Sequence, residues 1–91
     1  MSLYTFFFEF RGGTYISQVH AVKPADAKNR WAHGLNVDEI SGMGPATKAA
    51  LTQIVADDDP TAVEGMKNVW CIHGIVLGHP YLVHFVESAS T

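Results

Sequence analysis

The segment "LYTFFFEFRGGTYISQVHAV" constrains the fold more than any other part of the chain. Gly12-Gly13 lies between two runs that are rich in aromatic and β-branched residues. Two adjacent glycines can both adopt the positive φ angles of a type I′ turn, whose twist matches that of two antiparallel strands. We therefore expect a β-hairpin with its turn at Gly12-Gly13, in which Phe10 opposes Tyr15.

Side-chain alternation along these two strands predicts two different faces. We expect one face to lie in the core, and its residues are Tyr4, Phe6, Phe8, Phe10, Tyr15, Val19 and Ala21. The other face is mixed in character, and its residues are Thr5, Phe7, Glu9, Arg11, Thr14, Ile16, Gln18 and His20.

Two helices are predicted after this hairpin. The segment "KPADAKNRWAHGLN" has Pro24 at a first helical position and Gly34 where a left-handed cap would follow the last turn. Its residues Ala27, Trp31 and Leu35 recur every four positions and predict a buried stripe.

The segment "GPATKAALTQIVADDD" predicts a second helix from Pro45 to about Ala56. Leu51, Ile54 and Val55 form its expected buried stripe, and the acidic run that follows ends it.

The segment "WCIHGIVLGHPYLVHF" predicts a second hairpin. A two-residue turn at Gly78-His79 would place His73 opposite His84. A three-residue loop would instead place His73 opposite Phe85, and Pro80 leaves both registers open because it cannot donate a ladder hydrogen bond.

The predicted order of elements is thus ββααββ, within one domain of residues 1–91. We expect the α+β class, with a four-stranded antiparallel sheet and both helices packed on one face of it.

The second face of this sheet is too apolar to be exposed to solvent. A one-sided antiparallel sheet should be polar on its outer face, and a monomer rarely exposes an apolar patch beyond roughly 300–600 Å². Twofold dimers are the commonest oligomers, so we expect a homodimer or another protein partner on this face. The expected interface residues are Phe7, Ile16, His20, Ile75, Leu82 and His84.

Composition narrows the functional classes. Charged residues make up 16% of the chain, and the net charge of −3 argues against nucleic acid as a partner. A single cysteine fits a reducing compartment, and no apolar run approaches the roughly 20 residues of a membrane-spanning helix. We expect a cytoplasmic protein with no membrane association and no cofactor.

Cys71, His73 and His84 form a candidate zinc site, because thiolate and imidazole are zinc ligands and the predicted register places all three on one face. Their linear spacing matches no standard zinc signature. The alternative is that the histidines are satisfied by backbone or water, and that Cys71 is a small hydrophobe. Cys71 is also a candidate nucleophile with a histidine as its base, although its mid-strand position does not favour catalysis.

The segment "EISGMGPATKAAL" resembles the helix-hairpin-helix element of DNA-repair and recombination proteins. Ile40, Gly42, Met43, Gly44, Pro45 and Leu51 match the pattern of that element. The resemblance implies that residues 40–51 bind a nucleic-acid phosphate through the backbone amides of the turn at Gly42 and Gly44. Lys48 departs from that family, which usually has a small alanine at this position, but it is the nearby cation and completes the candidate phosphate-binding residues. The alternative is a plain connection between helices, in which glycine allows the tight geometry.

A non-enzymatic role is favoured over catalysis. The leading hypothesis is a small protein that self-associates or binds a protein partner through its open sheet face. Phosphate binding and a Cys/His zinc site are the alternatives.

Overall fold

The computed structural model of the chain describes residues 1–90, and the side chains of residues 1–89. The elements follow one another as β1 (Ser2–Phe10), β2 (Gly13–Ala21), α1 (Pro24–His33), the 3-10 helix η1 (Val37–Glu39), α2 (Pro45–Asp57), β3 (Thr61–Ala62), β4 (Val69–Val76) and β5 (His79–Ser90). The α+β class with two α-helices and an antiparallel sheet is therefore confirmed.

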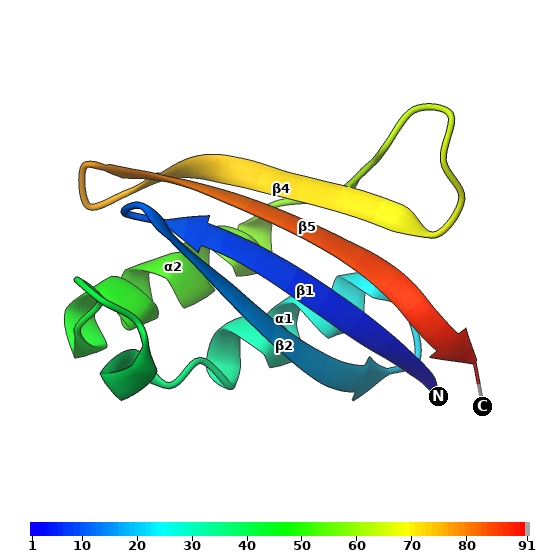
Figure 1. Cartoon of the computed structure of the whole chain (residues 1–91), viewed down its shortest axis with the longest axis horizontal. Coiled ribbons are helices and arrows are strands. Elements are labelled where there is room, and N and C mark those ends of the chain that lie inside the picture. Colours follow the sequence, from blue (N-terminus) through cyan, green and yellow to red (C-terminus); the bar gives the residue numbers. More distant parts are fainter. Residues whose placement is uncertain (91) are drawn as a thin grey trace.

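The sheet has five strands in the order β2-β1-β5-β4-β3, so β1 and β5 lie side by side near its centre (Figure 1). The prediction of four strands in the order ββααββ was wrong, because β3 adds a strand between α2 and β4. In β3, Thr61 pairs with Cys71 and Ala62 pairs with Trp70. A strand of two residues has no alternation that a sequence pattern could reveal.

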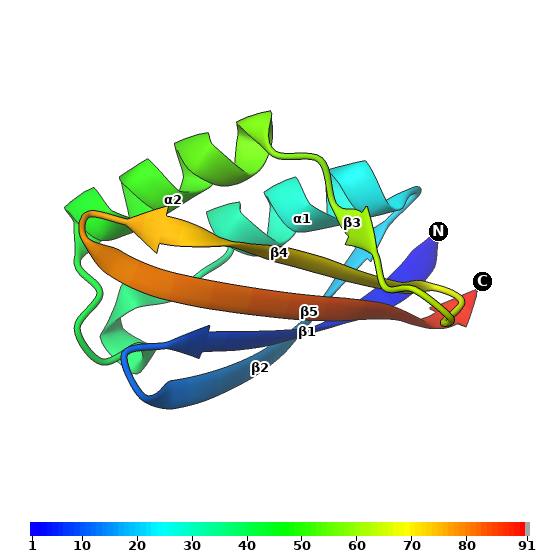
Figure 2. The ribbon, with the colours of Figure 1, turned by 90° about the horizontal axis from the view of Figure 1, so that it is seen from above.

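Both α-helices lie on one side of the sheet, and the other side is left open (Figure 2). Aromatic rings fill the space between the two layers. Phe6 stacks on Phe85 with ring centroids 4.5 Å apart, and on Trp31 at 5.3 Å. These pairs join β1, β5 and α1 into one core, as the predicted inward-facing row of aromatic residues requires.

Helix α1 starts at Pro24, as expected for a proline at the first helical position. Its predicted stripe of Ala27, Trp31 and Leu35 is buried. Gly34 was expected to adopt the left-handed conformation, but its φ of −86° places it in the right-handed region. Among the described residues, no helix is both long enough and apolar enough to cross a bilayer.

Each of the two hairpin turns starts one residue earlier than predicted. The first turn consists of Arg11 and Gly12, with φ angles of 50° and 83°, and Phe10 pairs with Gly13 across it. Tyr15 therefore opposes Phe8 and not Phe10. The shift is two residues along the partner strand, so the side chains of the two strands stay on their predicted faces. Arg11, which was predicted on the mixed face, lies in the turn, and its side chain contacts Gly42 instead.

The second turn repeats the same geometry. Leu77 and Gly78 have φ angles of 46° and 82°, and they replace the predicted Gly78-His79 turn. His73 pairs with Leu82, so the predicted pairing of His73 with His84 was wrong.

Candidate functional site

The side of the sheet that faces away from the helices, called here the open sheet face, is the most unusual surface of the molecule. Its residues come from all five strands and alternate with those of the core: they are Leu3, Thr5, Phe7, Glu9, Thr14, Ile16, Gln18, His20, Thr61, Val69, Cys71, His73, Ile75, Pro80, Leu82, His84, Val86 and Ser88. Glu9 is the only member of this set with a formal charge when the histidines are neutral. Outer faces of sheets are normally polar, so this composition needs an explanation.

A row of paired residues crosses the middle of the open sheet face. Ile16 pairs with Phe7, and Phe7 pairs with His84. The row continues from His84 to Cys71 and from Cys71 to Thr61. Ile16 is 63% exposed and Phe7 is 39% exposed, so the apolar part of the row lies at the surface.

The apolar surface continues toward the second hairpin turn. Ile75 is 66% exposed and Leu77 is 60% exposed, while Leu82 is half-buried between Glu9 and His73 in the strand register. A large aliphatic side chain that is two-thirds exposed contributes little to the core. These residues therefore add an apolar surface that the isolated fold does not use.

The opposite end of the open sheet face is polar. The Gln18 amide nitrogen donates to Oγ1 of Thr5 at 3.0 Å, and the hydroxyls of Thr5 and Ser88 lie 2.8 Å apart. The Ser88 hydroxyl also donates to the Leu3 carbonyl at 3.0 Å. This ladder satisfies its own polar groups and confines the apolar patch to the middle of the sheet and its turn end.

The structure brings all six predicted interface residues onto the open sheet face. Phe7, Ile16 and Ile75 lie in its exposed apolar part, and His20 lies near the polar end, opposite Leu3. Leu82 and His84 lie between them on β5. Their common location agrees with the alternation of the sequence, and their role in an interface remains a prediction.

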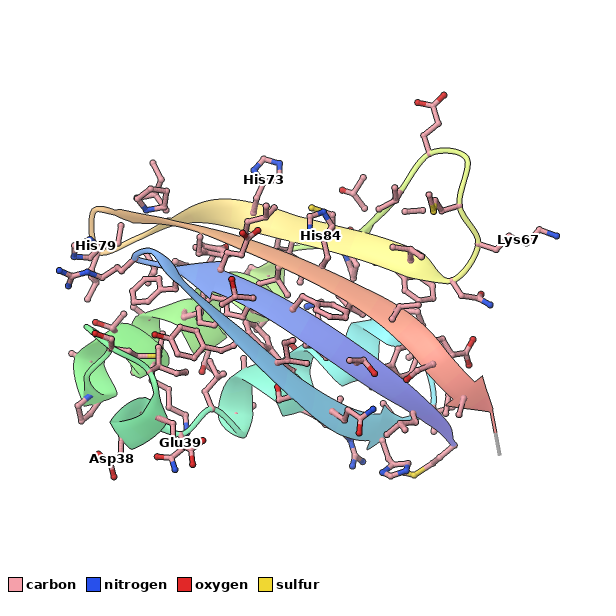
Figure 3. All side chains as sticks on the ribbon, viewed as in Figure 1. Asp38, Glu39, Lys67, His73, His79 and His84 are labelled. Carbon is pink, nitrogen blue, oxygen red and sulfur yellow. The ribbon has the colours of Figure 1, made fainter. Side chains whose placement is uncertain are left out.

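The three predicted zinc ligands are on this face but are not gathered at one point. Cys71 and His84 are direct cross-strand neighbours, whereas His73 opposes Leu82. Figure 3 shows the side chains of His73 and His84 projecting from separate points of neighbouring strands. Within residues 1–89, no group of three His, Cys, Asp or Glu side chains is arranged to hold a metal ion.

Cys71 has a poor setting for a nucleophile. Burial raises the pKa of the Cys71 thiol above its ordinary value, and the thiolate is the reactive form. The thiol is half-buried in a strand that is paired on both sides at this residue. The geometry favours a small packing residue over a catalytic one.

The predicted phosphate-binding segment has part of the expected geometry. Gly42 has a φ of +79°, and Gly44 precedes the first turn of α2. The element before this turn is the three-residue 3-10 helix η1, so the segment lacks the first α-helix of a helix-hairpin-helix pair. Lys48 lines a hollow of about 750 Å³ between the end of α1 and α2, together with His33 and Thr52.

The cation beside the Gly42 turn is Arg11, which sequence reasoning did not find. A Cβ atom on Gly42 would lie 2.8 Å from Cδ and from Nη1 of Arg11, so this side chain covers the glycine. The contact joins the β1–β2 turn to the loop before α2. Only the turn register places Arg11 there, and that register was predicted one residue too late.

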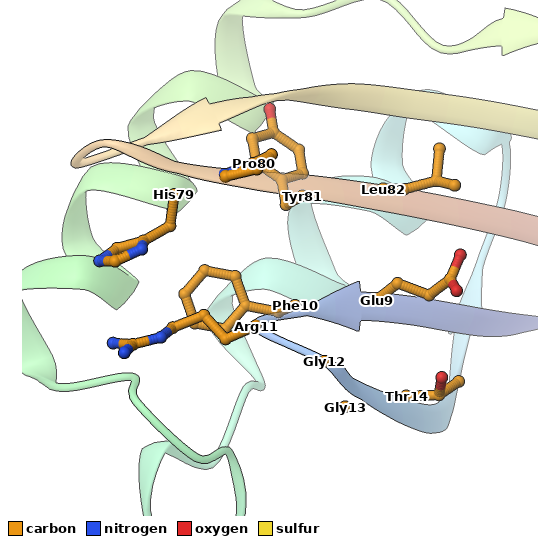
Figure 4. A pocket seen from close by; sticks show the side chains of 10 residues that line it. All are labelled: Glu9, Phe10, Arg11, Gly12, Gly13, Thr14, His79, Pro80, Tyr81 and Leu82. Atoms are coloured by element: carbon orange, nitrogen blue, oxygen red, sulfur yellow. The ribbon is translucent and has the colours of Figure 1, made fainter.

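A second hollow, of about 680 Å³, lies at the turn end of the sheet (Figure 4). Arg11 and His79 extend from its rim in a common direction, and the His79 ring meets the Phe10 ring edge-on at 6.0 Å. Glu9 and Leu82 line its other end. The hollow borders the open sheet face and shares Glu9, Thr14, Pro80 and Leu82 with it.

Comparison of the chain with protein-family models, with curated proteins and with solved structures gave no match.

Proposed function

We propose that the chain is a non-enzymatic protein that self-associates through its open sheet face. The observation that carries the proposal is the contrast between apolar exposure and charge on that face. Phe7, Ile16 and Ile75 are exposed there, and Glu9 supplies the only formal charge among its eighteen residues. Depletion of charge together with exposed aromatic and aliphatic residues is typical of the centre of an interface.

A second copy suits this face better than an unrelated surface on electrostatic grounds. Because the face is nearly uncharged, placing two copies of it together brings no row of like charges into contact. Glu9 lies beside Leu82 in the register, and His73 lies on the other side of Leu82. A twofold arrangement can therefore place each carboxylate near an imidazole of the other copy, with the apolar residues between them.

The setting of Cys71 and His84 on this face supports a binding role over catalysis. Burial raises the pKa of the Cys71 thiol, which disfavours the reactive thiolate. Among residues 1–89, no third His, Cys, Asp or Glu side chain joins Cys71 and His84 to form a metal site. A free cysteine that persists as a thiol fits a reducing compartment. The proposal accordingly places the protein in the cytoplasm.

Light scattering of the purified protein tests this proposal directly. We expect a dimer for the wild type at neutral pH, and a monomer for the double variant Phe7→Lys with Ile75→Lys. Two ammonium groups cannot be buried unpaired in an apolar interface. Both positions are exposed in the isolated fold, so the variant should keep its circular dichroism spectrum.

A matched control places the same two charges elsewhere. Ala49→Lys with Gln53→Lys adds two lysines to exposed positions of α2 and should leave the dimer intact. A wild type that stays monomeric at high concentration contradicts the proposal. A dimer that survives Phe7→Lys with Ile75→Lys shows that another surface is responsible.

Phosphate binding at residues 40–51 is the second candidate function, and the position of Arg11 supports it. The first turn of α2 has no acidic residue and no side-chain cap, and the Arg11 side chain lies directly against Gly42. Helix N-termini attract phosphate, and a nearby guanidinium strengthens that attraction. The net charge of −3 acts against a long nucleic acid.

Binding of a fluorescent DNA duplex at two salt concentrations tests this second candidate. If Arg11 contacts a phosphate, Arg11→Ala should weaken binding and reduce the salt slope by about 1. Lys67→Ala, in an exposed loop, removes the same charge far from the segment and should change neither quantity by as much. Equal effects of the two variants would mean that residues 40–51 hold no phosphate.

A further inference from the structure

The outer edge of β2 is long, regular and unprotected. β2 has nine residues, pairs with β1 without a bulge, and forms one edge of the sheet. It contains no lysine, no other formally charged residue and no proline. Proteins usually protect an edge strand with charged side chains, with proline or with a bulge, because an open edge recruits further strands.

At the opposite edge of the sheet, part of the outer strand is covered by the chain itself. β3 covers β4 at Cys71 and Trp70, and the Val63 amide donates to the Val69 carbonyl at 2.9 Å. The chain thus closes part of the β4 edge with its own backbone, whereas β2 has no neighbour beyond β1 among the described residues.

The hairpin register determines which backbone groups of β2 point outward. Phe10 and Gly13 flank a two-residue turn, and such a pair is hydrogen-bonded, with non-hydrogen-bonded pairs alternating from there. The odd-numbered residues of β2 therefore bond to β1. The N–H and C=O groups of the even-numbered residues point away from the sheet, and these residues are Thr14, Ile16, Gln18 and His20.

We infer that two copies of the chain pair along this edge, with β2 antiparallel to β2 of the second copy and Ser17 at the twofold axis. In this register Ile16 pairs with Gln18 of the second copy, and Thr14 pairs with His20. Each of these pairs exchanges two hydrogen bonds, so all outward groups of both strands are used. Registers centred on Ile16 or Gln18 would leave one residue of each strand unpaired.

The side chains of β2 permit this arrangement. Thr14, Ile16, Gln18 and His20 are all exposed, and Ser17 is exposed on the helix side, so α1 does not block the middle of the strand. The absence of formal charge on β2 means that pairing with itself brings no like charges together within the strand. The two Ile16 side chains become diagonal neighbours on the open sheet face.

This edge contact uses a different surface from the proposed face-to-face association, and the two are alternative contacts for one dimer. It would join two five-stranded sheets into one continuous sheet. It also identifies a second copy as the partner, because the arrangement of outward groups is symmetric about Ser17.

Cysteine cross-linking in a Cys71→Ser background tests the register. Ser17 residues of the two copies would form a non-hydrogen-bonded pair with Cα atoms about 4.5 Å apart, which is within disulfide reach. Thr14 residues would be about 20 Å apart, six residues along the strand. Under mild oxidation, Ser17→Cys should give a disulfide-linked dimer at least about tenfold faster than Thr14→Cys, because only the first pair meets the disulfide distance. Equal rates would overturn the inference.

A charge variant provides a second, non-covalent test. Ser17→Lys places two lysines directly opposite each other at the axis and should abolish the edge contact, whereas Ala49→Lys should not. If Ser17→Lys abolishes the dimer and the double variant Phe7→Lys with Ile75→Lys does not, the result supports pairing along the β2 edge and contradicts association through the open sheet face. The reverse result contradicts the edge alone, and a wild-type monomer contradicts both.

Discussion

The ammonium group of Lys28 on α1 donates a hydrogen bond to the carbonyl oxygen of Val55 in the last turn of α2. It also donates to the Ala56 carbonyl at 3.3 Å, and Lys28 is only 3% exposed. The carbonyl end of a helix carries partial negative charge. The buried cation therefore links the two helices and offsets the unfavourable placement of the acidic run Asp57–Asp59.

Replacement of this lysine should destabilise the fold. Lys28→Met keeps much of the apolar stem but removes the donor, so we expect a loss of about 1–3 kcal/mol in the free energy of unfolding, the cost of losing a charged hydrogen bond to buried partners. Urea denaturation measures it. Lys67→Met, at an exposed loop position, should change stability by less than about 0.5 kcal/mol. Equal midpoints for the two variants would contradict the role assigned to Lys28.

The strained second turn predicts a stabilising substitution. Leu77 has a φ of +46° and an exposed side chain, and a left-handed conformation costs an ordinary residue about 1–2 kcal/mol. Leu77→Asn creates the Asn-Gly pair that type I′ turns prefer and should raise stability by about 1 kcal/mol, measured by thermal unfolding. Leu77→Ala removes the same exposed side chain without relieving the strain, and it should bring no such gain.

Gly12 occupies the second position of the first turn with a φ of +83°. A Cβ atom there would meet no described atom within 4 Å, so a substitution is strained only through the backbone. Gly12→Val should lower stability by about 1–2 kcal/mol, and Gly12→Asn should lower it less. An unchanged melting temperature for the valine variant would be incompatible with the observed turn.

The Tyr81 hydroxyl is buried and has no hydrogen-bond partner in the part of the chain that the structure describes. Tyr81→Phe should therefore leave the free energy of unfolding unchanged, or raise it by about 1 kcal/mol, because an unsatisfied buried group is removed. A clear loss of stability on chemical denaturation would show that the hydroxyl has a partner in solution.

Burial, followed by the charge of Asp58, also raises the pKa of the Tyr81 phenol from its ordinary value of 10.0. The folded-state pKa lies above the unfolded-state pKa, so the neutral phenol's contribution is complete below pH 10.0 and is lost as the pH rises through the folded value. Tyr81→Phe should accordingly lose less stability than the wild type in alkaline solution. Tyr4, whose pKa burial also raises, should keep part of the alkaline loss in both proteins.

Cys71 should react slowly in the folded state. Burial disfavours its thiolate, so a thiol reagent should label it slowly in buffer and quickly in denaturant. A cysteine at exposed position 49, made as Ala49→Cys in a Cys71→Ser background, gives the rate for an accessible thiol. Native labelling of Cys71 at that same rate would restore the nucleophile hypothesis.

The faces of the sheet could be predicted from the sequence, but the hairpin registers could not. A shift of two residues leaves the alternation intact, so the apolar pattern fits both registers. In the sequence, Gly13 indicated a turn. In the structure, a glycine is needed at position 13 because the Tyr15 side chain packs over it: a Cβ atom there would lie 2.6 Å from the Tyr15 hydroxyl. Gly74 has the same relation to Tyr81, with the Cβ position 2.9 Å from the hydroxyl oxygen.

Two contacts between distant parts of the chain could not be predicted from the sequence for another reason. The contact of Arg11 with Gly42 and that of Lys28 with Val55 both join residues that are more than twenty positions apart. Neither contact follows from a local pattern, because each depends on how the hairpin and the two helices pack. The exposed apolar residues of the open sheet face, in contrast, follow from alternation alone.

The adjacency of β1 and β5 has a consequence for synthesis on the ribosome. The pairing of Phe6 on β1 with Phe85 on β5 can form only late in synthesis, because most of the chain separates these two residues. Contacts of such long range form slowly, after the local hairpins and helices. Until β5 emerges from the exit tunnel, the aromatic side chains of β1 lack the strand against which they pack. During that time the nascent chain should remain a substrate for chaperones that bind exposed aromatic residues.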